Sequence, residues 1–592
     1  MMRLLKAMLP DSLLTHLPTI PPADRCRALI RRSLLMSDLP SAAIPQRFSA
    51  LRFNNRHARL PEHFFARVAP QSRLATRLAD VSPDCARLLG LTELVEEDSP
   101  ESLSAREQLR QVMAGEQLLA GMDALAQKYT GHQFGQYNPQ LGDGRGLLLG
   151  ELVVTRAGTD APQEVTFDLH LKGAGRTPYS RFGDGQAVVR SSVREYLASE
   201  YMAALGIPTS RALALAVNGE RVQRETVEPG ATLMRVAESH LRFGHFEWLA
   251  HSGRYDDLKV LIDHALREHF PECLAEAVHS DAPLNDEVRV TAALGMFKIV
   301  IARTARLIAA WQSYGFVHAV MNTDNMSLLG MTFDYGPYAF LDGYEANLIP
   351  NHTDQAGRYG FAQQPGIGLW NLERLGVAFS PLIDVDALSE ALGQYEGELQ
   401  REYARLMRMR LGLPDTREED MTLVQQWRDL LTEGRVDHTH AYRLLSHWQV
   451  TQSAPEALVL LLAGVRGPHG NAAEARDKAE AWLARYQERV MAAELSAQDE
   501  RQRRLAMLGC NPLYVPRTHL LLDVIARVEQ GDDSTLKAFR ERLAMPFFRP
   551  EEGSVEAALA FGLAHGVEAE LVDEWTCPPA LDAAPICMSC SS

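Results

Sequence analysis

The chain has 592 residues, of which 46% are apolar and 23% charged, and its formal net charge is −16. Such a chain can build a large core with more than one packing unit, and its acidity argues against the basic face of a nucleic-acid-binding protein. No run of 18 uncharged apolar residues occurs, so we expect no membrane span. Seven cysteines are too few for a disulfide scaffold.

Residues 1–48 combine arginines, leucines and serines with Asp11, Asp24 and Asp38. Transit peptides are rich in arginine but poor in acidic residues, and a secretory signal has a compact apolar core that this stretch lacks. We therefore predict an N-terminal extension, which need not be ordered, on a bacterial cytoplasmic protein. A mitochondrial presequence is the alternative.

The rest of the chain changes from mixed to helical patterns near residue 245. Helical spacing and alternation of apolar residues predict the earlier elements. These are helices at 105–128 and 187–205, a strand pair at 147–155 and 165–172, and short strands at 211–217 and 232–239. The later part is helical and is interrupted by residues 317–342. This order predicts an α+β fold with a ligand cleft between a small mixed part and a larger helical part.

The first glycine-rich stretch, residues 131–150, places Gly142, Gly144 and Gly146 ahead of a predicted strand. Glycine lets the backbone approach a phosphate and point N–H groups at it, and Arg145 adds a permanent positive charge. The pattern is neither a Walker A loop nor a Rossmann turn. The alternative is a plain turn that leads into a hairpin.

A lysine, a second glycine loop and a glutamate follow in order. Lys172 ends a predicted strand, the loop carries Asp184 and Gly185, and the next predicted helix carries Glu195. A strand lysine held by a helix glutamate is the phosphate-positioning device of protein kinases. The alternative is a surface lysine and an exposed helix glutamate.

Two arginines, Arg235 and Arg242, come next. The bidentate guanidinium suits phosphate. Taken alone, the pair is better explained as two surface ion pairs.

Residues 317–342 are the most specific stretch of the chain. Asp324 and Asn325 lie on a turn-like MNTDN, and Asp334 opens an Asp-Tyr-Gly that looks like the Asp-Phe-Gly of kinases. Asn325 and Asp334 offer the oxygen ligands that Mg²⁺ prefers, and Asp324 is placed to accept a proton from a substrate hydroxyl. No His-Arg-Asp is present. The alternative is an Asx-rich turn between two strands.

Together these segments resemble the selenoprotein O family of kinase-like proteins from about Leu51 to Ser592. The resemblance rests on several long motifs in the correct order. They are GHQFG at 131–135, QLGDGRG at 140–146, LKGAGRTPYSRFGDG at 171–185, SSVREYLASE at 191–200, MNTDNMS at 321–327, DYGP at 334–337, NPLYVPR at 511–517 and the closing CSS.

The resemblance implies a protein-kinase-like bilobal fold and transfer of AMP from ATP, or UMP from UTP, to Ser, Thr or Tyr of proteins. The nucleotide is bound in reverse relative to kinases, and pyrophosphate leaves. By motif, Asp324 is the general base, Asn325 and Asp334 bind Mg²⁺ or Mn²⁺, and Glu195 positions Lys172. The residues implied in nucleotide binding are Gly142, Gly144, Arg145, Lys172, Asp184, Gly185, Arg235, Arg242 and Asp334.

The C-terminus fits the same family, whose animal members end in a selenocysteine before two serines. Cys590 holds that position here, and Cys587 forms a Cys-x-x-Cys pair with it, a spacing typical of redox chemistry. Free thiols in an unstructured tail are the alternative. Some members carry a further cysteine after the metal aspartate, where this chain has Pro350, so we expect no disulfide from tail to loop.

The predicted domains are the extension, an N-lobe at 49–243, a helical C-lobe at 244–500, and a C-terminal helical segment with the Cys-x-x-Cys tail at 501–592. The expected partners are protein substrates, including redox proteins and the chain itself, with no nucleic acid or membrane, and we expect a monomer. Two alternative functions remain: a protein kinase that transfers the γ-phosphoryl group, and a non-catalytic nucleotide-binding redox sensor.

Overall fold

The computed structural model describes residues 42–96, 99–158, 161–274, 284–464, 472–547, 574–576 and 578–579. Cys577, Cys587 and Cys590, and with them the predicted redox pair, lie outside these ranges. Of the predicted N-terminal extension, residues 42–48 are described. They lie along the sheet, where the N–H of Ile44 donates to the carbonyl of Thr155 at 2.8 Å.

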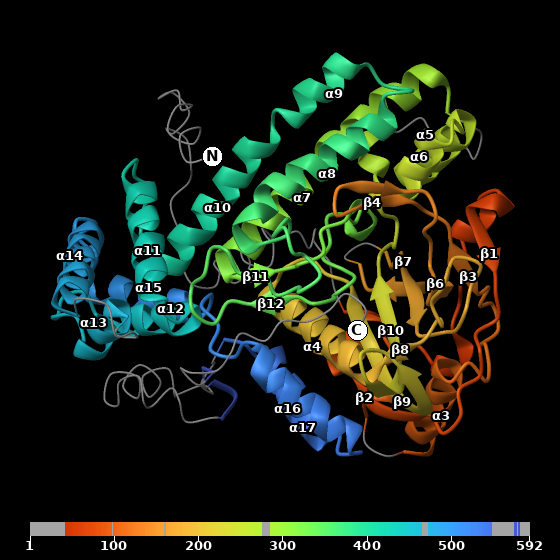
Figure 1. Cartoon of the computed structure of the whole chain (residues 1–592), viewed down its shortest axis with the longest axis horizontal. Coiled ribbons are helices and arrows are strands. Elements are labelled where there is room, and N and C mark those ends of the chain that lie inside the picture. Colours follow the sequence, from red (N-terminus) through yellow and green to blue (C-terminus); the bar gives the residue numbers. More distant parts are fainter. Residues whose placement is uncertain are drawn as a thin grey trace.

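An eight-stranded antiparallel sheet dominates the first part of the described chain (Figure 1). The strands along the sheet are β1 (Phe65–Arg67), β3 (Leu125–Gln127), β6 (Gly146–Arg156), β7 (Gln163–Lys172), β10 (Val227–Ala237), β9 (Arg211–Gln223) and β2 (Arg77–Val81), with β8 (Ala187–Val188) beside β10. The predicted strand pair is confirmed as the β6–β7 hairpin. β9 and β10 are longer than predicted because their polar ends continue the pairing beyond the apolar stretch.

Helices cover both faces of this sheet. α4 (Val189–Leu205) packs its apolar side on one face, where Val193 shares a core with Leu233. α3 (Pro100–Met113) and α2 (Pro83–Leu88) cover the other face, where Val112 shares a core with Met234. Because successive strand residues point to opposite faces, Leu233 and Met234 contact different helices.

The predicted helix at 105–128 is wrong in its second half. α3 ends at Met113, and Gly115 and Gly121 then adopt positive φ angles of 69° and 88°, which leave the helical path. Leu119 and Met122 pack against the same core as the helix, but from a loop. Their apolar spacing therefore reflects a shared core and no regular helix.

Helices make up most of the chain after residue 243 (Figure 1). They are α5 (Phe243–His251), α6 (Tyr255–His269), α7 (Asp286–Tyr314), α8 (Gln364–Phe379), α9 (Val385–Leu392), α10 (Tyr395–Leu411), α11 (Asp420–Gly434), α12 (His438–His447), α13 (Glu456–Ala463), α14 (Ala472–Met491), α15 (Ala497–Leu508), α16 (Thr518–Glu529) and α17 (Ser534–Ala544). The later part of the chain is therefore helical, as predicted, and α7 is its longest described helix. Within the described ranges, no helix is both long and apolar enough to span a membrane.

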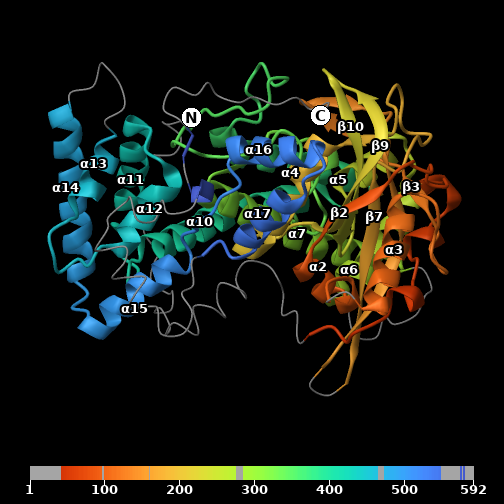
Figure 2. The same ribbon diagram turned by 90° about the horizontal axis from the view of Figure 1, so that it is seen from below.

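The last two helices return to the sheet part of the molecule. α16 and α17 pack against α4, as Figure 2 shows, although more than 300 residues of sequence separate them from it. Arg540 of α17 extends this contact by donating to the buried carboxylate of Asp80 in β2 at 2.6 Å. The C-terminal helices therefore stabilise the element that carries Glu195.

The segment between α7 and α8 is held in place by backbone pairing. β11 (Phe316–Val317) pairs with β12 (Ala339–Phe340) and closes the base of the loop that carries Asp324 and Asp334. Further along, the N–H of Leu328 donates to Leu241 at 2.9 Å and that of Phe243 to Met326 at 3.0 Å. These bonds fix the loop against the β10–α5 connection.

Candidate active site

Lys172, Glu195 and Arg235 form a buried chain of ion pairs where β7, α4 and β10 meet. Lys172 lies opposite Leu233 on the neighbouring strand, so it shares a sheet face with Arg235 two residues further on. α4 covers this face. The Glu195 carboxylate accepts from Lys172 Nζ at 2.7 Å and from Arg235 Nη2 at 3.0 Å. The three residues are at most 8% exposed, which excludes the alternative of a surface lysine and an exposed glutamate.

The two pKa values show how this pair keeps its charges. Burial works to raise the pKa of Glu195, but Arg235 and Lys172 outweigh it and lower that pKa to about 2. Burial lowers the pKa of Lys172 to about 8, and the attraction of Glu195 limits the fall. Between these values the ammonium group is a fixed positive charge inside the protein.

Asp334 extends the ion-pair chain from Arg235 to Arg242. Its Oδ1 lies 2.8 Å from Arg235 Nη1, and its Oδ2 accepts from Arg242 Nη1. Burial opposes its ionisation, but Arg242 and Arg235 hold the pKa of Asp334 well below the usual range. Its φ is +57°, an uncommon conformation for a residue with a side chain. We call Lys172, Glu195, Arg235, Asp334 and Arg242 the site cluster.

Arg242 joins the site cluster to the predicted base. The same Nη1 that contacts Asp334 also donates to the backbone carbonyl of Asp324 at 2.7 Å. Its guanidinium carbon lies 4.7 Å from the ring centre of Tyr129 and 4.6 Å from that of Phe333. Arg242 is 2% exposed, so the alternative of surface ion pairs is wrong for this residue and for the buried Arg235.

Asp324 is a buried carboxylate with one engaged oxygen. It lies in the 3-10 helix Thr323–Asn325 and is 7% exposed. Oδ2 accepts from Gln133 Nε2 at 3.2 Å, whereas Oδ1 has no hydrogen-bond partner among the described residues. Burial raises the pKa of Asp324 to about 7, with Arg242 as the main opposing influence. A carboxylate with these properties is suited to accept a proton near neutral pH.

The two glycine loops lie against each other beside the site cluster. Thr177 Oγ1 donates to the carbonyl of Asp143 at 2.6 Å, and Ser180 Oγ donates to that of Gly144 at 2.5 Å. Gly142 has a φ of +144°, and a Cβ there would lie 2.5 Å from the ring of Tyr179. The carbonyl of Arg145 accepts from the N–H of Gly173, the residue after Lys172, at 2.7 Å, and burial lowers the pKa of the Arg145 guanidinium.

Asp184 and Gly185 lie in the second glycine loop, and within the described ranges neither is hydrogen-bonded to the site cluster. Asp184 pairs with Arg224 at 2.7 Å and accepts from the N–H of Gln186 at 2.9 Å. Gly185 has a φ of +74°, and a Cβ there would collide with Gly175. Both residues therefore shape the second glycine loop and hold it to the β9–β10 turn.

Asn325 and Asp334 are the predicted metal ligands. The amide nitrogen of Asn325 donates to Val320 O at 2.9 Å, which leaves its oxygen as the atom available to a cation. In the described ranges, no three His, Cys, Asp or Glu side chains are arranged to hold a metal ion. One amide oxygen and one carboxylate fit Mg²⁺ or a similar hard cation that takes its other ligands from nucleotide phosphates and water.

The hairpin of β4 (Gly131–Gln133) and β5 (Gln136–Asn138) was missed as part of the site. Its GHQFG motif supports the family resemblance, but no side chain in it was assigned a role. In the structure Gln133 contacts Asp324, and the N–H of Phe134 donates to Asn322 at 3.2 Å. The available signal was an amide side chain flanked by two glycines, which is too common to predict this contact.

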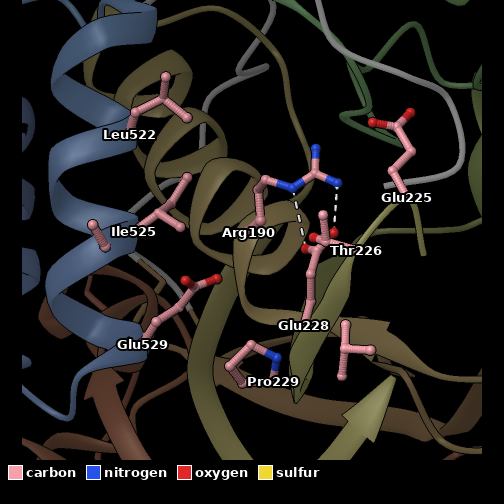
Figure 3. Close-up of a pocket in the computed structure, with 10 residues that line it drawn as sticks. Arg190, Glu225, Thr226, Glu228, Pro229, Leu522, Ile525 and Glu529 are labelled. Atoms are coloured by element: carbon pink, nitrogen blue, oxygen red, sulfur yellow. Dashed lines mark hydrogen bonds and ion pairs between the residues drawn. The ribbon is translucent and has the colours of Figure 1, made fainter. Parts of the chain in front are cut away.

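A separate cavity of about 350 Å³ lies between the β9–β10 turn and α16 (Figure 3). An apolar wall of Leu522 and Ile525 faces the ion pair of Arg190 with Glu228, whose nearest atoms are 2.8 Å apart. No predicted site residue lines this cavity.

The chain is similar to known proteins over most of its length. The family model described as protein adenylyltransferase SelO matches residues 47–544. The protein nucleotidyltransferase YdiU of Chromohalobacter salexigens is 51% identical over 556 residues, which cover 94% of this chain and all of that protein. Proteins with the same name from Vibrio vulnificus and Vibrio cholerae are 43% and 44% identical, over 86% and 84% of this chain and 96% and 94% of theirs.

Proposed function

The chain belongs to the SelO family of protein adenylyltransferases, and we propose that the site described above transfers AMP from ATP to hydroxyl groups of proteins. It is a protein nucleotidyltransferase, so the alternatives of a protein kinase and a non-catalytic sensor lose their support. One observation carries the proposal. A single nitrogen of Arg242 contacts both the Asp334 carboxylate and the Asp324 backbone, which brings the proposed metal ligand and the proposed base together.

The phosphates of the nucleotide bind at the positive side chains of the site cluster. Lys172, Arg235 and Arg242 are buried and held by carboxylates, so they need little reorganisation when the triphosphate arrives. Arg145 and the backbone of Gly142 and Gly144 add donors from the first glycine loop, while Asp184 and Gly185 hold the second loop beside it. Charge that develops on the departing pyrophosphate is stabilised by the same cations.

Asp324 acts as the general base. Its carboxylate, of which Oδ1 has no hydrogen-bond partner among the described residues, accepts the proton of the acceptor hydroxyl while the oxygen of that hydroxyl attacks the α-phosphorus, and the bond to pyrophosphate breaks. Burial favours this role because it raises the pKa of the carboxyl group to about 7. Substrates are Ser, Thr or Tyr side chains of proteins, including redox proteins and this chain itself.

Asn325 and Asp334 hold a divalent cation, Mg²⁺ or Mn²⁺. When bound there, the cation neutralises phosphate charge and helps to orient the nucleotide. Arg235 and Arg242 keep the Asp334 carboxylate ionised in its absence, which preserves a ligand ready for the cation.

We further infer a bilobal kinase-like arrangement, with an N-lobe at 49–243, a helical C-lobe at 244–500 and a C-terminal segment from 501. Its support is a sheet with a lysine–glutamate pair followed by helices that carry the catalytic segment. The bacterial sources of the relatives support action in a bacterial cytoplasm. We propose a monomer.

The test uses ATP labelled at either the α- or the γ-phosphate, with Mg²⁺ or Mn²⁺ and acceptor protein. We expect the α-label alone to enter protein. Incorporation of the γ-label would overturn the proposal in favour of a kinase. A parallel incubation with α-labelled UTP decides whether the chain prefers AMP or UMP, since the relatives are named for nucleotidyl transfer in general.

A further inference from the structure

The β4–β5 hairpin packs directly against the catalytic segment. The N–H of His132 donates to Thr323 Oγ1 at 2.7 Å, next to Asp324, and that of Phe134 donates to Asn322 Oδ1 at 3.2 Å. These backbone bonds hold the hairpin in place without help from the Gln133 side chain. The Gln133 amide is therefore not needed to anchor the hairpin.

Three consecutive hydrogen bonds connect the first glycine loop to the Asp324 carboxylate. The N–H of Gln140 donates to Asn138 Oδ1 at 3.1 Å, Asn138 Nδ2 donates to Gln133 Oε1 at 3.2 Å, and Gln133 Nε2 donates to Asp324 Oδ2 at 3.2 Å. A backbone N–H can only donate, so the first bond fixes the orientation of the Asn138 amide. That amide in turn fixes the orientation of Gln133, whose N–H₂ group must then face Asp324.

The hairpin also limits where the carboxylate of Asp324 can lie. A Cβ on Gly131 would be 2.7 Å from Oδ1 and 2.9 Å from the Cβ of Asp324, so no side chain fits at position 131. With Gln133 engaging Oδ2 and Gly131 lying against Oδ1, the carboxylate is held in one rotation, in which Oδ1 is buried and has no hydrogen-bond partner among the described residues.

We propose that Gln133 is a positioning residue for nucleotidyl transfer. It holds the Asp324 carboxylate in the rotation needed to accept the proton of the acceptor hydroxyl, and Asn138 keeps the Gln133 amide in the required orientation. The series of hydrogen bonds begins at Gln140, two residues before Gly142. It therefore links the glycines proposed to contact the nucleotide to the proposed base. This inference rests on the proposed role of Asp324 as the general base.

The test measures kcat and the KM for ATP in two single variants and their combination. Gln133→Leu removes the donor, and we expect kcat to fall about tenfold to a hundredfold, as for a misplaced catalytic group, with the KM for ATP within about twofold. Asn138→Asp cannot donate to Gln133. The Gln133 amide should then reverse and turn its oxygen toward Asp324, so kcat should fall although Gln133 is intact.

The combination separates positioning from general damage. If Asn138 acts through Gln133, the double variant Gln133→Leu/Asn138→Asp should be no slower than Gln133→Leu. Gln136→Leu, an exposed change on the same hairpin, is the matched control and should keep wild-type kinetics and melting temperature. A kcat within twofold of wild type in Gln133→Leu, or losses in the two single variants that multiply, would overturn the inference.

Asp324→Asn in the same assay distinguishes the two levels of the argument. Activity in that variant would contradict the proposed function itself. An inactive Asp324→Asn together with a normal Gln133→Leu would overturn the positioning role alone.

Discussion

Two of the buried networks of charged side chains in the described chain differ in how completely their hydrogen-bonding atoms are engaged. In the site cluster and the adjoining Asp324, one carboxylate oxygen has no partner among the described residues, and Asp334 has a positive φ. The second network, the Arg517 cluster, consists of Arg517, Asp342 and Asp437. Arg517 Nη1 lies 2.6 Å from Asp342 and 2.9 Å from Asp437, and Nη2 donates to Asp437 at 3.2 Å.

The Arg517 cluster is closed. Asp437 also caps α12 by accepting from the N–H of His440 at 2.8 Å, so both of its oxygens are engaged. Although burial opposes it, Arg517 holds the pKa of Asp437 well below the usual range, whereas burial raises that of Asp324 to about 7. A buried charge alone therefore does not indicate a functional site. Asp324 differs from Asp437 in combining an oxygen that has no hydrogen-bond partner among the described residues with a raised pKa, next to a cluster of positive side chains.

The largest effect that sharpens this comparison is expected at Asp324. Asp324→Asn removes the proton acceptor but keeps the shape of the side chain, so we expect at least a ~1000-fold loss of nucleotidyl transfer. The melting temperature should stay the same or rise, because an unpaired buried carboxylate is unfavourable for folding. Transfer rates and thermal unfolding of the same preparation check both parts. A fall in melting temperature with retained transfer would contradict the comparison.

The matched change in the Arg517 cluster is Asp437→Asn. Asparagine keeps the helix cap but leaves Arg517 with less compensating charge, so we expect a loss of about 3 kcal/mol in unfolding free energy. The rate of transfer per folded molecule should stay within about twofold. Denaturant unfolding and active-site-normalised rates measure the two effects. A lower rate of transfer with an unchanged free energy of unfolding would mean that Asp437 takes part in the reaction and contradict the comparison.

A pH titration of nucleotide binding tests the cation of the site cluster. Burial lowers the pKa of Lys172 to about 8, so the ammonium form is present below pH 8 and is lost above it. The Kd for ATP should be constant below about pH 8 and rise up to about tenfold per pH unit above it. Glu195→Gln removes the attraction that supports the ammonium form, so the rise should begin at a lower pH. Identical profiles in wild type and variant would disprove the pairing.

The smallest effect is expected in the second glycine loop, at the ion pair of Asp184 with Arg224. The Asp184–Arg224 pair is partly exposed, at 35% and 13% for the two side chains. Ion pairs of this kind contribute about 0.5 kcal/mol, so Asp184→Asn should raise the KM for ATP two- to threefold and leave kcat unchanged. A rise of tenfold or more in the KM for ATP would mean that Asp184 contacts the nucleotide directly.

The sequence predicts those elements of the site that have a clear apolar pattern or a known order of motif residues. The β6–β7 hairpin and α4 follow from alternation and helical spacing of apolar residues. The pairing of Lys172 with Glu195 follows from a known order of elements. The helix predicted to Lys128 was wrong because apolar spacing does not distinguish a helix from a loop on the same core.

The contacts that complete the site could not be predicted from the sequence. Gln133 and Asp324 are 191 positions apart, and their hydrogen bond depends on a hairpin that folds against the catalytic segment. The burial of Arg235 and Arg242 depends in the same way on a loop that pairs with the β10–α5 connection. Spacing within one element carries no information about such long-range pairs.

The most direct test of the account is the intact mass of protein incubated with ATP and a divalent cation. The samples are wild type, Asp324→Asn and Asp437→Asn, each with the same acceptor protein. We expect the mass of AMP on protein hydroxyls with wild type and with folded Asp437→Asn, and none with Asp324→Asn. Addition of AMP by Asp324→Asn at the wild-type rate would contradict the assignment of this buried carboxylate as the base.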